Sequence, residues 1–112
     1  MAMDEAEFRE HAEAAIEELD KAFSRLANQH GFDTDVEGGV LKVSFEEPEQ
    51  GIFVISSNAP ARQIWVSARL SSFKFDWVSA EQRFALHGTG EPINSVLQRL
   101  VRAQLGDELI QL

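Results

Sequence analysis

A chain of 112 residues, 44% of them hydrophobic and 26% charged, has the balance of one globular domain and is too short for two. Ten Lys and Arg against nineteen Asp and Glu give a net charge of −9, so we expect no binding to nucleic acid. A sequence without cysteine excludes disulfides, thiolate nucleophiles and cysteine-ligated metal sites. Apolar stretches are far shorter than the roughly 20 residues of a membrane span, and the N-terminus, MAMDEAEF, is acidic where a signal peptide would be basic. We therefore expect a cytoplasmic protein with no membrane partner.

The negative charge is concentrated at one end of the chain. Residues 1–40 hold eleven acidic and three basic residues, a local net charge of −8. The other seventy-two residues hold eight acidic and seven basic residues, a net charge of −1. Almost the whole negative field therefore arises from the N-terminal third of the sequence.

Apolar residues recur at helical spacing from Asp4 to about Gln29, which predicts a helix buried along one side. The buried side is expected to hold Phe8, Ala12, Ala15, Ile16, Leu19, Phe23 and Leu26. At 100° per residue, the opposite side carries a solvent-facing row of carboxylates: Glu10, Glu13, Glu17 and Asp20. Gly31 is the expected left-handed cap of this helix.

The apolar period then changes to two, which predicts strands. We expect six strands, at 33–37, 40–46, 51–56, from Pro60 to Ala68, 73–77 and 82–86. Gly38-Gly39 is the strongest hairpin signal in the sequence. Six consecutive strands on short links predict an antiparallel meander.

A second amphipathic helix is predicted from Pro92 to Leu105, with Gly106 ending it. Residues 107–112 follow as a short C-terminal tail. Its apolar side chains are expected to cover the groove between the helices: Leu109, Ile110 and Leu112.

Both helices have an apolar face to bury, so the predicted fold is α+β in a single domain of residues 1–112. We expect a two-layer α/β sandwich with two helices on one face of a six-stranded antiparallel sheet. The other sheet face is then open to solvent, and the alternation of the fourth strand places Trp65 on it. Trp65 either packs across neighbouring strands or belongs to a protein interface, and the pattern favours neither.

The acidic helix row is the first candidate for a functional site. A solvated helix surface is the ordinary interpretation of such a row. Here only Lys21 interrupts it, and the next strand adds Asp33, Asp35 and Glu37 on one side of its pleat. Exposed carboxylate oxygens are ligands that hard cations prefer, ferric iron included. Because these side chains are mobile and lie on a convex surface, metal binding through them is expected to be weak.

Other patterns give little support for chemistry. His11 lies one turn from Glu7 and could join a mixed nitrogen and oxygen ligand set, although a lone surface histidine is usually no ligand. The sequence holds no G-x-S-x-G elbow and no apparent nucleophile–base pair, so acyl transfer is unsupported. The HGTG stretch leads into Glu91-Pro92, which argues against a nucleotide loop.

The order helix, six strands, helix resembles the frataxin family and its bacterial CyaY-type members. The most specific features are the stretch NAPARQIWVS at 58–67, Phe75-Asp76-Trp77 and the hairpin at 37–41. The resemblance spans roughly the whole chain. It implies a small acidic protein that binds iron weakly and docks on the cysteine desulfurase and the scaffold of iron–sulfur cluster assembly.

The resemblance also implies where these sites lie. It places the iron-binding carboxylates on Glu5, Glu7, Glu13, Asp20, Asp33 and Asp35, and the partner surface on Asn58, Gln63 and Trp65. We add two acidic helix positions and call the set the acidic ridge: Glu5, Glu7, Glu10, Glu13, Glu17, Asp20, Asp33 and Asp35. The later part of the helix, usually acid-rich in bacterial relatives, here reads Lys21, Ser24, Arg25, Ala27 and Gln29. Iron binding is therefore expected to be weak and centred on the first three turns.

We expect a non-enzymatic regulator or iron donor in cluster assembly, with Fe²⁺ or Fe³⁺ as a weakly bound ion. A monomer that can oligomerise with iron is expected. Two alternatives remain open: an adaptor of the same machinery that has lost metal binding, and a weak ferroxidase. The sequence lacks the paired Glu-x-x-His helices of an efficient di-iron site, which argues against the second.

Overall fold

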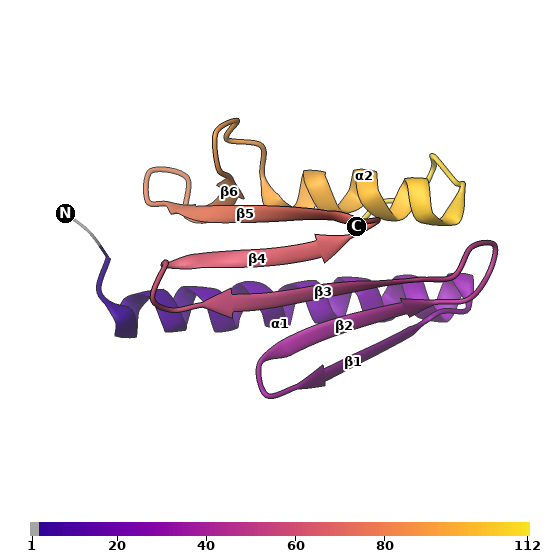
Figure 1. The fold of residues 1–112 in the computed structure, drawn as a ribbon, viewed down its shortest axis with the longest axis horizontal. Coiled ribbons are helices and arrows are strands. Elements are labelled where there is room, and N and C mark those ends of the chain that lie inside the picture. Colours follow the sequence, from indigo (N-terminus) through magenta and orange to yellow (C-terminus); the bar gives the residue numbers. More distant parts are fainter. Residues whose placement is uncertain (1–2) are drawn as a thin grey trace.

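The computed structural model describes residues 3–112, in which two helices and six strands follow the order α1, β1 to β6, α2 (Figure 1). The helices are α1 (Glu5–His30) and α2 (Ile93–Leu105). The strands are β1 (Asp33–Glu37), β2 (Val40–Phe45), β3 (Gly51–Asn58), β4 (Gln63–Ala68), β5 (Ser71–Val78) and β6 (Arg83–Leu86). Neither helix of the described residues has the length and apolarity that a bilayer crossing requires.

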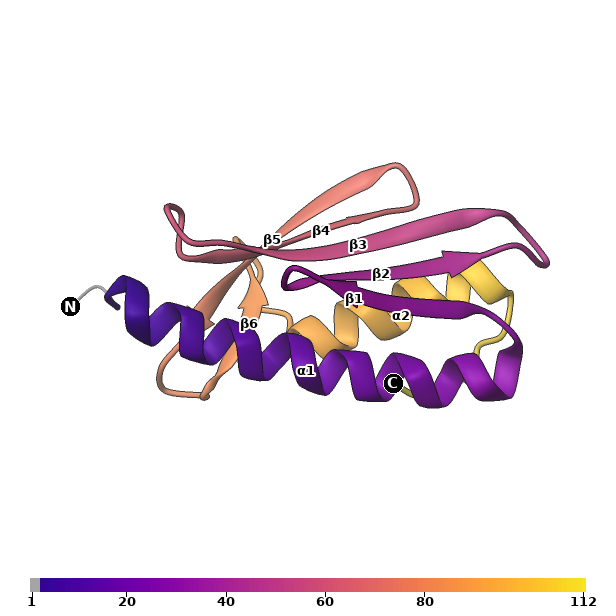
Figure 2. The same cartoon turned by 90° about the horizontal axis from the view of Figure 1, so that it is seen from below.

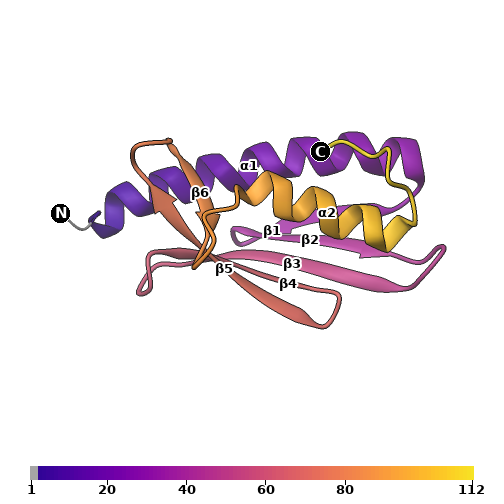
Figure 3. The same ribbon diagram turned by 90° about the horizontal axis from the view of Figure 1, so that it is seen from above.

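The six strands form one antiparallel sheet in sequence order, so the predicted meander is confirmed. Its register pairs Leu41 with Ile55 and Ile55 with Val66, and all three side chains are buried. One residue further along, the pair Lys42 and Val54 faces the other side of the sheet. Figures 2 and 3 show both helices on one side of the sheet. The predicted two-layer sandwich with one open face is therefore confirmed.

Aromatic side chains fill the space between the two layers. The most deeply buried are Phe8, Phe23, Phe45, Phe53, Phe75 and Phe84. The ring centroid of Phe53 lies 6.5 Å from that of Phe23 on α1 and 4.9 Å from that of Phe45 on β2. Phe53 therefore joins the long helix to the centre of the sheet.

Both ends of α1 are fixed by local chemistry. The Asp4 carboxylate accepts a hydrogen bond from the backbone N–H of Glu7 at 2.8 Å, which satisfies one of the free N–H groups of the first turn. That hydrogen bond holds the pKa of Asp4 below its ordinary value. At the other end Gly31 has φ +75°, and its N–H donates to the Ala27 carbonyl at 2.8 Å. The predicted glycine cap is confirmed.

The strand boundaries differ from the prediction around Pro60. β3 continues to Asn58 and β4 begins only at Gln63, so the expectation of a strand starting at Pro60 is wrong. The side chain of Asn58 accepts a hydrogen bond from the Ala61 N–H at 2.9 Å and closes a turn over residues 59–62. Proline cannot donate to a strand ladder, which also favours this turn.

The C-terminal tail packs mainly through Ile110. The side chain of Ile110 is buried and its carbonyl accepts a hydrogen bond from Arg102 Nε at 2.7 Å. Leu112 is half-buried, but Leu109 is 87% exposed. The expectation that Leu109 covers the groove is wrong because its N–H bonds the Asp107 carboxylate at 2.9 Å, in a turn that leaves the side chain in solvent.

We expect Ile110→Ala to lower the free energy of unfolding by about 2–5 kcal/mol, because it empties a buried apolar site. Leu109→Ala, the matched control, is expected to change it by about 0.5 kcal/mol or less. Urea unfolding followed by circular dichroism measures both values. Equal effects of the two substitutions would contradict the position of the tail.

Candidate functional site

The acidic ridge follows the outer side of α1 and the edge strand β1, which lies against α1 (Figure 2). Seven of its eight residues are exposed and Asp20 is half-buried. The helical period that buries Phe8, Ile16 and Phe23 against the sheet turns the α1 carboxylates outward. The predicted solvent-facing row is therefore confirmed for Glu10, Glu13 and Glu17, whereas Asp20 is half-buried and accepts a hydrogen bond from the Ser24 hydroxyl at 3.4 Å.

The bases that neutralise the ridge come from α1 itself. Arg9 lies 3.5 Å from Glu5, and Lys21 lies 3.5 Å from Glu17, both as exposed pairs one helical turn apart. Such pairs contribute only a few tenths of a kcal/mol. The other six ridge carboxylates have no ion-pair partner within residues 3–112: Glu7, Glu10, Glu13, Asp20, Asp33 and Asp35. The ridge therefore keeps most of its negative charge.

Part of the ridge lines a hollow between α1 and the β1–β2 hairpin. Glu13, Glu17 and Asp20 lie along it, together with Val36 and the Gly38-Gly39 turn. The hollow has a volume of about 540 Å³. The base Arg9 lines the same hollow, and because the hairpin turn carries no side chains here, Glu13 and Glu17 remain exposed to solvent.

The two ridge residues of β1 point away from α1. In the register of β1 and β2, Asp35 lies opposite Lys42, and both side chains are on the open side of the sheet. The neighbouring Val36 lies opposite Leu41, on the helix side. Asp33 has the same orientation as Asp35. The ridge thus consists of two rows on either side of the sheet edge. Among the described residues, no group of three or more Asp, Glu or His side chains has the geometry to hold a metal ion.

Gln63 and Trp65, which the resemblance assigns to the partner surface, lie on the open face of the sheet, as the alternation of β4 predicted for Trp65. Trp65 is 38% exposed and lies between Ser56 of β3 and Lys74 of β5. The Lys74 ammonium lies 5.1 Å from the centre of the Trp65 ring, a cation–π contact. Trp65 therefore packs on a neighbouring strand, which is one of the two interpretations that the sequence left open, and part of its ring stays exposed to solvent.

Gln63 and Trp65 belong to a chain of hydrogen bonds that the sequence did not predict. The Trp65 indole N–H donates to Gln63 Oε1 at 2.9 Å, and Gln63 Nε2 donates to Asp76 Oδ1 at 2.9 Å. The other Asp76 oxygen lies 2.6 Å from His87 Nδ1. The alternation of β4 and β5 could have placed Gln63 and Asp76 on one face, but no signal set their register.

Burial raises the pKa of Asp76, but other influences prevail. Hydrogen bonds from Gln63 and His87, together with the attraction of His87, leave that pKa below its ordinary value. Asp76 is therefore an ionised acceptor at neutral pH.

His11 is a packing residue. Its ring stacks on Trp77 with centroids 3.8 Å apart and planes 12° from parallel, and Trp77 in turn packs edge-on against Phe84. This contact holds the imidazole against β5. The structure does not bring His11 and Glu7 into a metal-ligand group.

A small two-layer domain with a charged edge and one open sheet face is the class of protein that this geometry defines. Residues 1–107 match the family described as the Frataxin-like domain. The chain is 32% identical over 111 residues to the "Iron-sulfur cluster assembly protein CyaY" of Azotobacter vinelandii (strain DJ / ATCC BAA-1303), covering 97% of this chain and 96% of the relative. The solved structure of frataxin from Psychromonas ingrahamii has the same fold, with a TM-score of 0.72 over 94% of each chain at 19% identity. The chain belongs to the frataxin-like family.

Proposed function

We propose that this protein is a non-enzymatic component of iron–sulfur cluster assembly that binds iron weakly on the acidic ridge and docks on the cysteine desulfurase and scaffold. Its family membership supports a role in this process, since the Azotobacter vinelandii relative is named for iron–sulfur cluster assembly. The observation that carries the proposal is the ridge itself. Six of its eight carboxylates have no basic partner in the part of the chain that the structure describes.

Iron is cargo in this proposal and not a resident cofactor. Carboxylate oxygens suit Fe²⁺ and still more the harder Fe³⁺. The carboxylates of α1 lie on a convex helix surface, and those of β1 face the other side of the sheet edge. An ion is therefore held by one or two side chains at a time and exchanges readily, as a donor of iron requires.

Docking uses two features of different character. The unneutralised ridge attracts a basic surface and raises the rate of encounter. The partner surface, with Trp65 as its aromatic anchor, supplies specificity. Asp33 and Asp35 share the open sheet face with Trp65, so one partner can contact charged edge and aromatic centre together.

The test of iron binding is a titration with Fe²⁺ under anaerobic conditions, followed by NMR of the backbone amides. Paramagnetic broadening is expected first along Glu7–Asp20 and at Asp33 and Asp35, with the strongest effect in the first three turns of α1. Each carboxylate contributes on the order of 1 kcal/mol of attraction to an adjacent cation in water. Replacing Glu7, Glu10 and Glu13 with glutamine is therefore expected to raise the iron concentration for half-broadening at least about tenfold.

The matched control replaces Glu46, Glu47 and Glu108 with glutamine, which removes the same charge at exposed positions outside the ridge. Equal effects of the two triple variants, or broadening spread evenly over the domain, would contradict a ridge site. Docking without any broadening would instead support the metal-free adaptor.

A further inference from the structure

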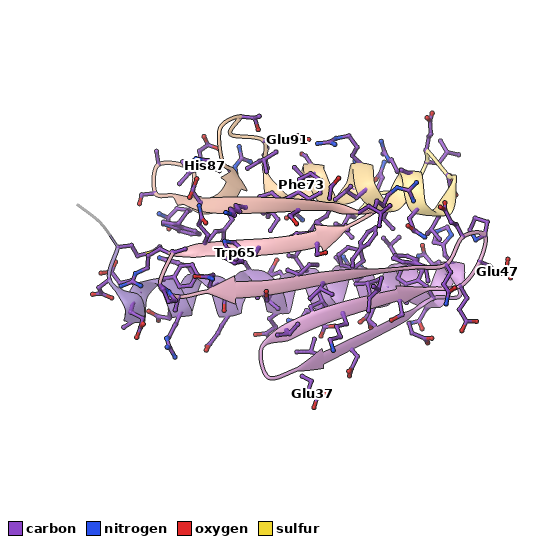
Figure 4. The ribbon with its side chains drawn as sticks, viewed as in Figure 1. Glu37, Glu47, Trp65, Phe73, His87 and Glu91 are labelled. Carbon is purple, nitrogen blue, oxygen red and sulfur yellow. The ribbon has the colours of Figure 1, made fainter. Side chains whose placement is uncertain are left out.

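The hydrogen-bonded chain on the open face crosses three neighbouring parts of the fold. It begins at Trp65 and Gln63 on β4, passes through Asp76 on β5 and ends at His87 in the loop after β6. Figure 4 shows Trp65 and His87 with β5 between them. The two end residues are 22 positions apart in the sequence but are joined by three contacts of 2.6–2.9 Å.

The backbone fixes the place of His87 in this chain. Its N–H donates to the carbonyl of Lys74 on β5 at 2.9 Å, and the N–H of Leu86 donates to the carbonyl of Glu91 at 2.7 Å. The His87 side chain is nevertheless 70% exposed. The imidazole therefore contributes little to the buried core, and its contact with Asp76 is its main interaction.

The order of donors and acceptors gives the chain a single direction. Ionised Asp76 can only accept hydrogen bonds, so it selects the NH₂ end of the Gln63 amide and the protonated Nδ1 of His87. With its NH₂ end on Asp76, the Gln63 amide presents its oxygen to the Trp65 indole N–H. If the amide rotated by 180°, two donors would face each other at Trp65. The carboxylate of Asp76 thus acts on the Trp65 side chain through Gln63, without touching Trp65 itself.

Lys74 holds the ring from another side. Its ammonium lies over the Trp65 ring at 5.1 Å from the centroid, on the strand that also carries Asp76. Gln63 therefore constrains the N–H edge of the Trp65 indole and Lys74 constrains its face before a partner binds. Fixing a rotamer in advance removes an ordering cost from the binding step.

We propose that Asp76 and His87 are positioning residues, which hold Gln63 and Trp65 in the orientation that the partner protein recognises. This inference rests on the proposed function, because it assumes that docking uses the partner surface. The partner would present an apolar pocket for the fixed indole ring, with hydrogen-bonding groups at its rim. Asp76 and His87 act through Gln63 and Trp65 and need not touch that partner.

The first measurement uses the protein without a partner. His87→Ala and Asp76→Ala are expected to shift the Trp65 indole N–H resonance and to accelerate its exchange with water, because its acceptor is no longer held. His87→Asn keeps an N–H donor close to the position of Nδ1 and is expected to restore the wild-type signal. His30→Ala is the matched control, at an exposed histidine outside the chain.

The second measurement is affinity for the desulfurase–scaffold complex. We expect His87→Ala to weaken binding about three- to tenfold, the factor that corresponds to one ordinary hydrogen bond. Asp76→Ala is expected to weaken it by at least as much. His87→Asn and His30→Ala are expected to stay within about twofold of the wild type, and thermal unfolding checks that each variant is folded.

The outcomes separate this inference from the proposed function. An unchanged Trp65 resonance in both alanine variants overturns the positioning role. A changed resonance with unchanged affinity, while Trp65→Ala weakens binding, also overturns it and leaves the docking proposal intact. If Trp65→Ala itself has no effect on affinity, the partner surface is wrong and both proposals fail at this face.

Discussion

Reversing three ridge charges, with Glu10→Lys, Glu13→Lys and Glu17→Lys, is expected to weaken binding to the cysteine desulfurase about ten- to a hundredfold at low salt. Long-range attraction accelerates association by factors of this size, and the reversal turns attraction into repulsion over the middle of α1. Only Glu17 of the three has an ion-pair partner within residues 3–112, so little native structure is lost. Affinity measured at several salt concentrations checks the result. The loss is expected mainly in the association rate and to shrink as salt rises.

The control for this experiment makes the same change in net charge at another place on the surface. Glu46→Lys, Glu47→Lys and Glu108→Lys also move the net charge from −9 to −3, at exposed positions away from the ridge. In Figure 4, Glu47 lies at the end of the molecule remote from the start of α1. If this variant loses as much affinity as the ridge variant, overall charge and not the ridge determines docking.

Much of the fold could be predicted because its signals are local. The spacing of Phe8, Ile16 and Phe23 determines which side of α1 is buried, and Gly31 marks its end by a backbone conformation that favours glycine. Strict alternation in β4 places Trp65 on the face opposite Ile64. These inferences need no knowledge of distant residues, and the structure confirms them.

Two features of the fold differ from the prediction because a side chain forms a hydrogen bond with the backbone nearby. The strand expected at Pro60 fails because the side-chain amide oxygen of Asn58 accepts a hydrogen bond from the Ala61 N–H and closes a turn. The hydrophobicity of Leu109 alone predicts burial, but the Asp107 carboxylate accepts a hydrogen bond from its N–H in a turn that leaves the side chain exposed. Hydrophobicity predicts which residues favour burial, and local hydrogen bonds can override it.

The candidate site was predicted in composition but not in geometry. The helical period predicted the row of carboxylates on α1. Alternation alone does not say which side of β1 faces the helix. Only the strand register shows that Asp35 lies on the other side of the sheet from that row. The link from Gln63 through Asp76 to His87 depends on strand pairing and on a loop conformation. Neither of these follows from a periodic pattern.

Phe53→Ala is expected to lower the free energy of unfolding by about 3–5 kcal/mol, a large share of the roughly 5–15 kcal/mol that stabilises a typical domain. Its side chain is fully buried and packs against Phe23 and Phe45, so truncation opens a cavity between α1 and the sheet. Phe53→Leu, which retains most of the volume, is expected to lose less. Urea unfolding followed by circular dichroism gives the three values.

The neighbouring residue provides the control. Ile52 is 51% exposed and lies on the open face, so Ile52→Ala is expected to cost about 1 kcal/mol or less. Ser56 lies on the same side of β3 as Ile52 and opposite Trp65 in the register, so Ile52 and Trp65 share the open face. The comparison of Ile52→Ala with Phe53→Ala therefore also tests whether this face is free. Equal losses at positions 52 and 53 would mean that both faces of β3 are covered. The partner surface would then have no free sheet face on which to receive a partner protein.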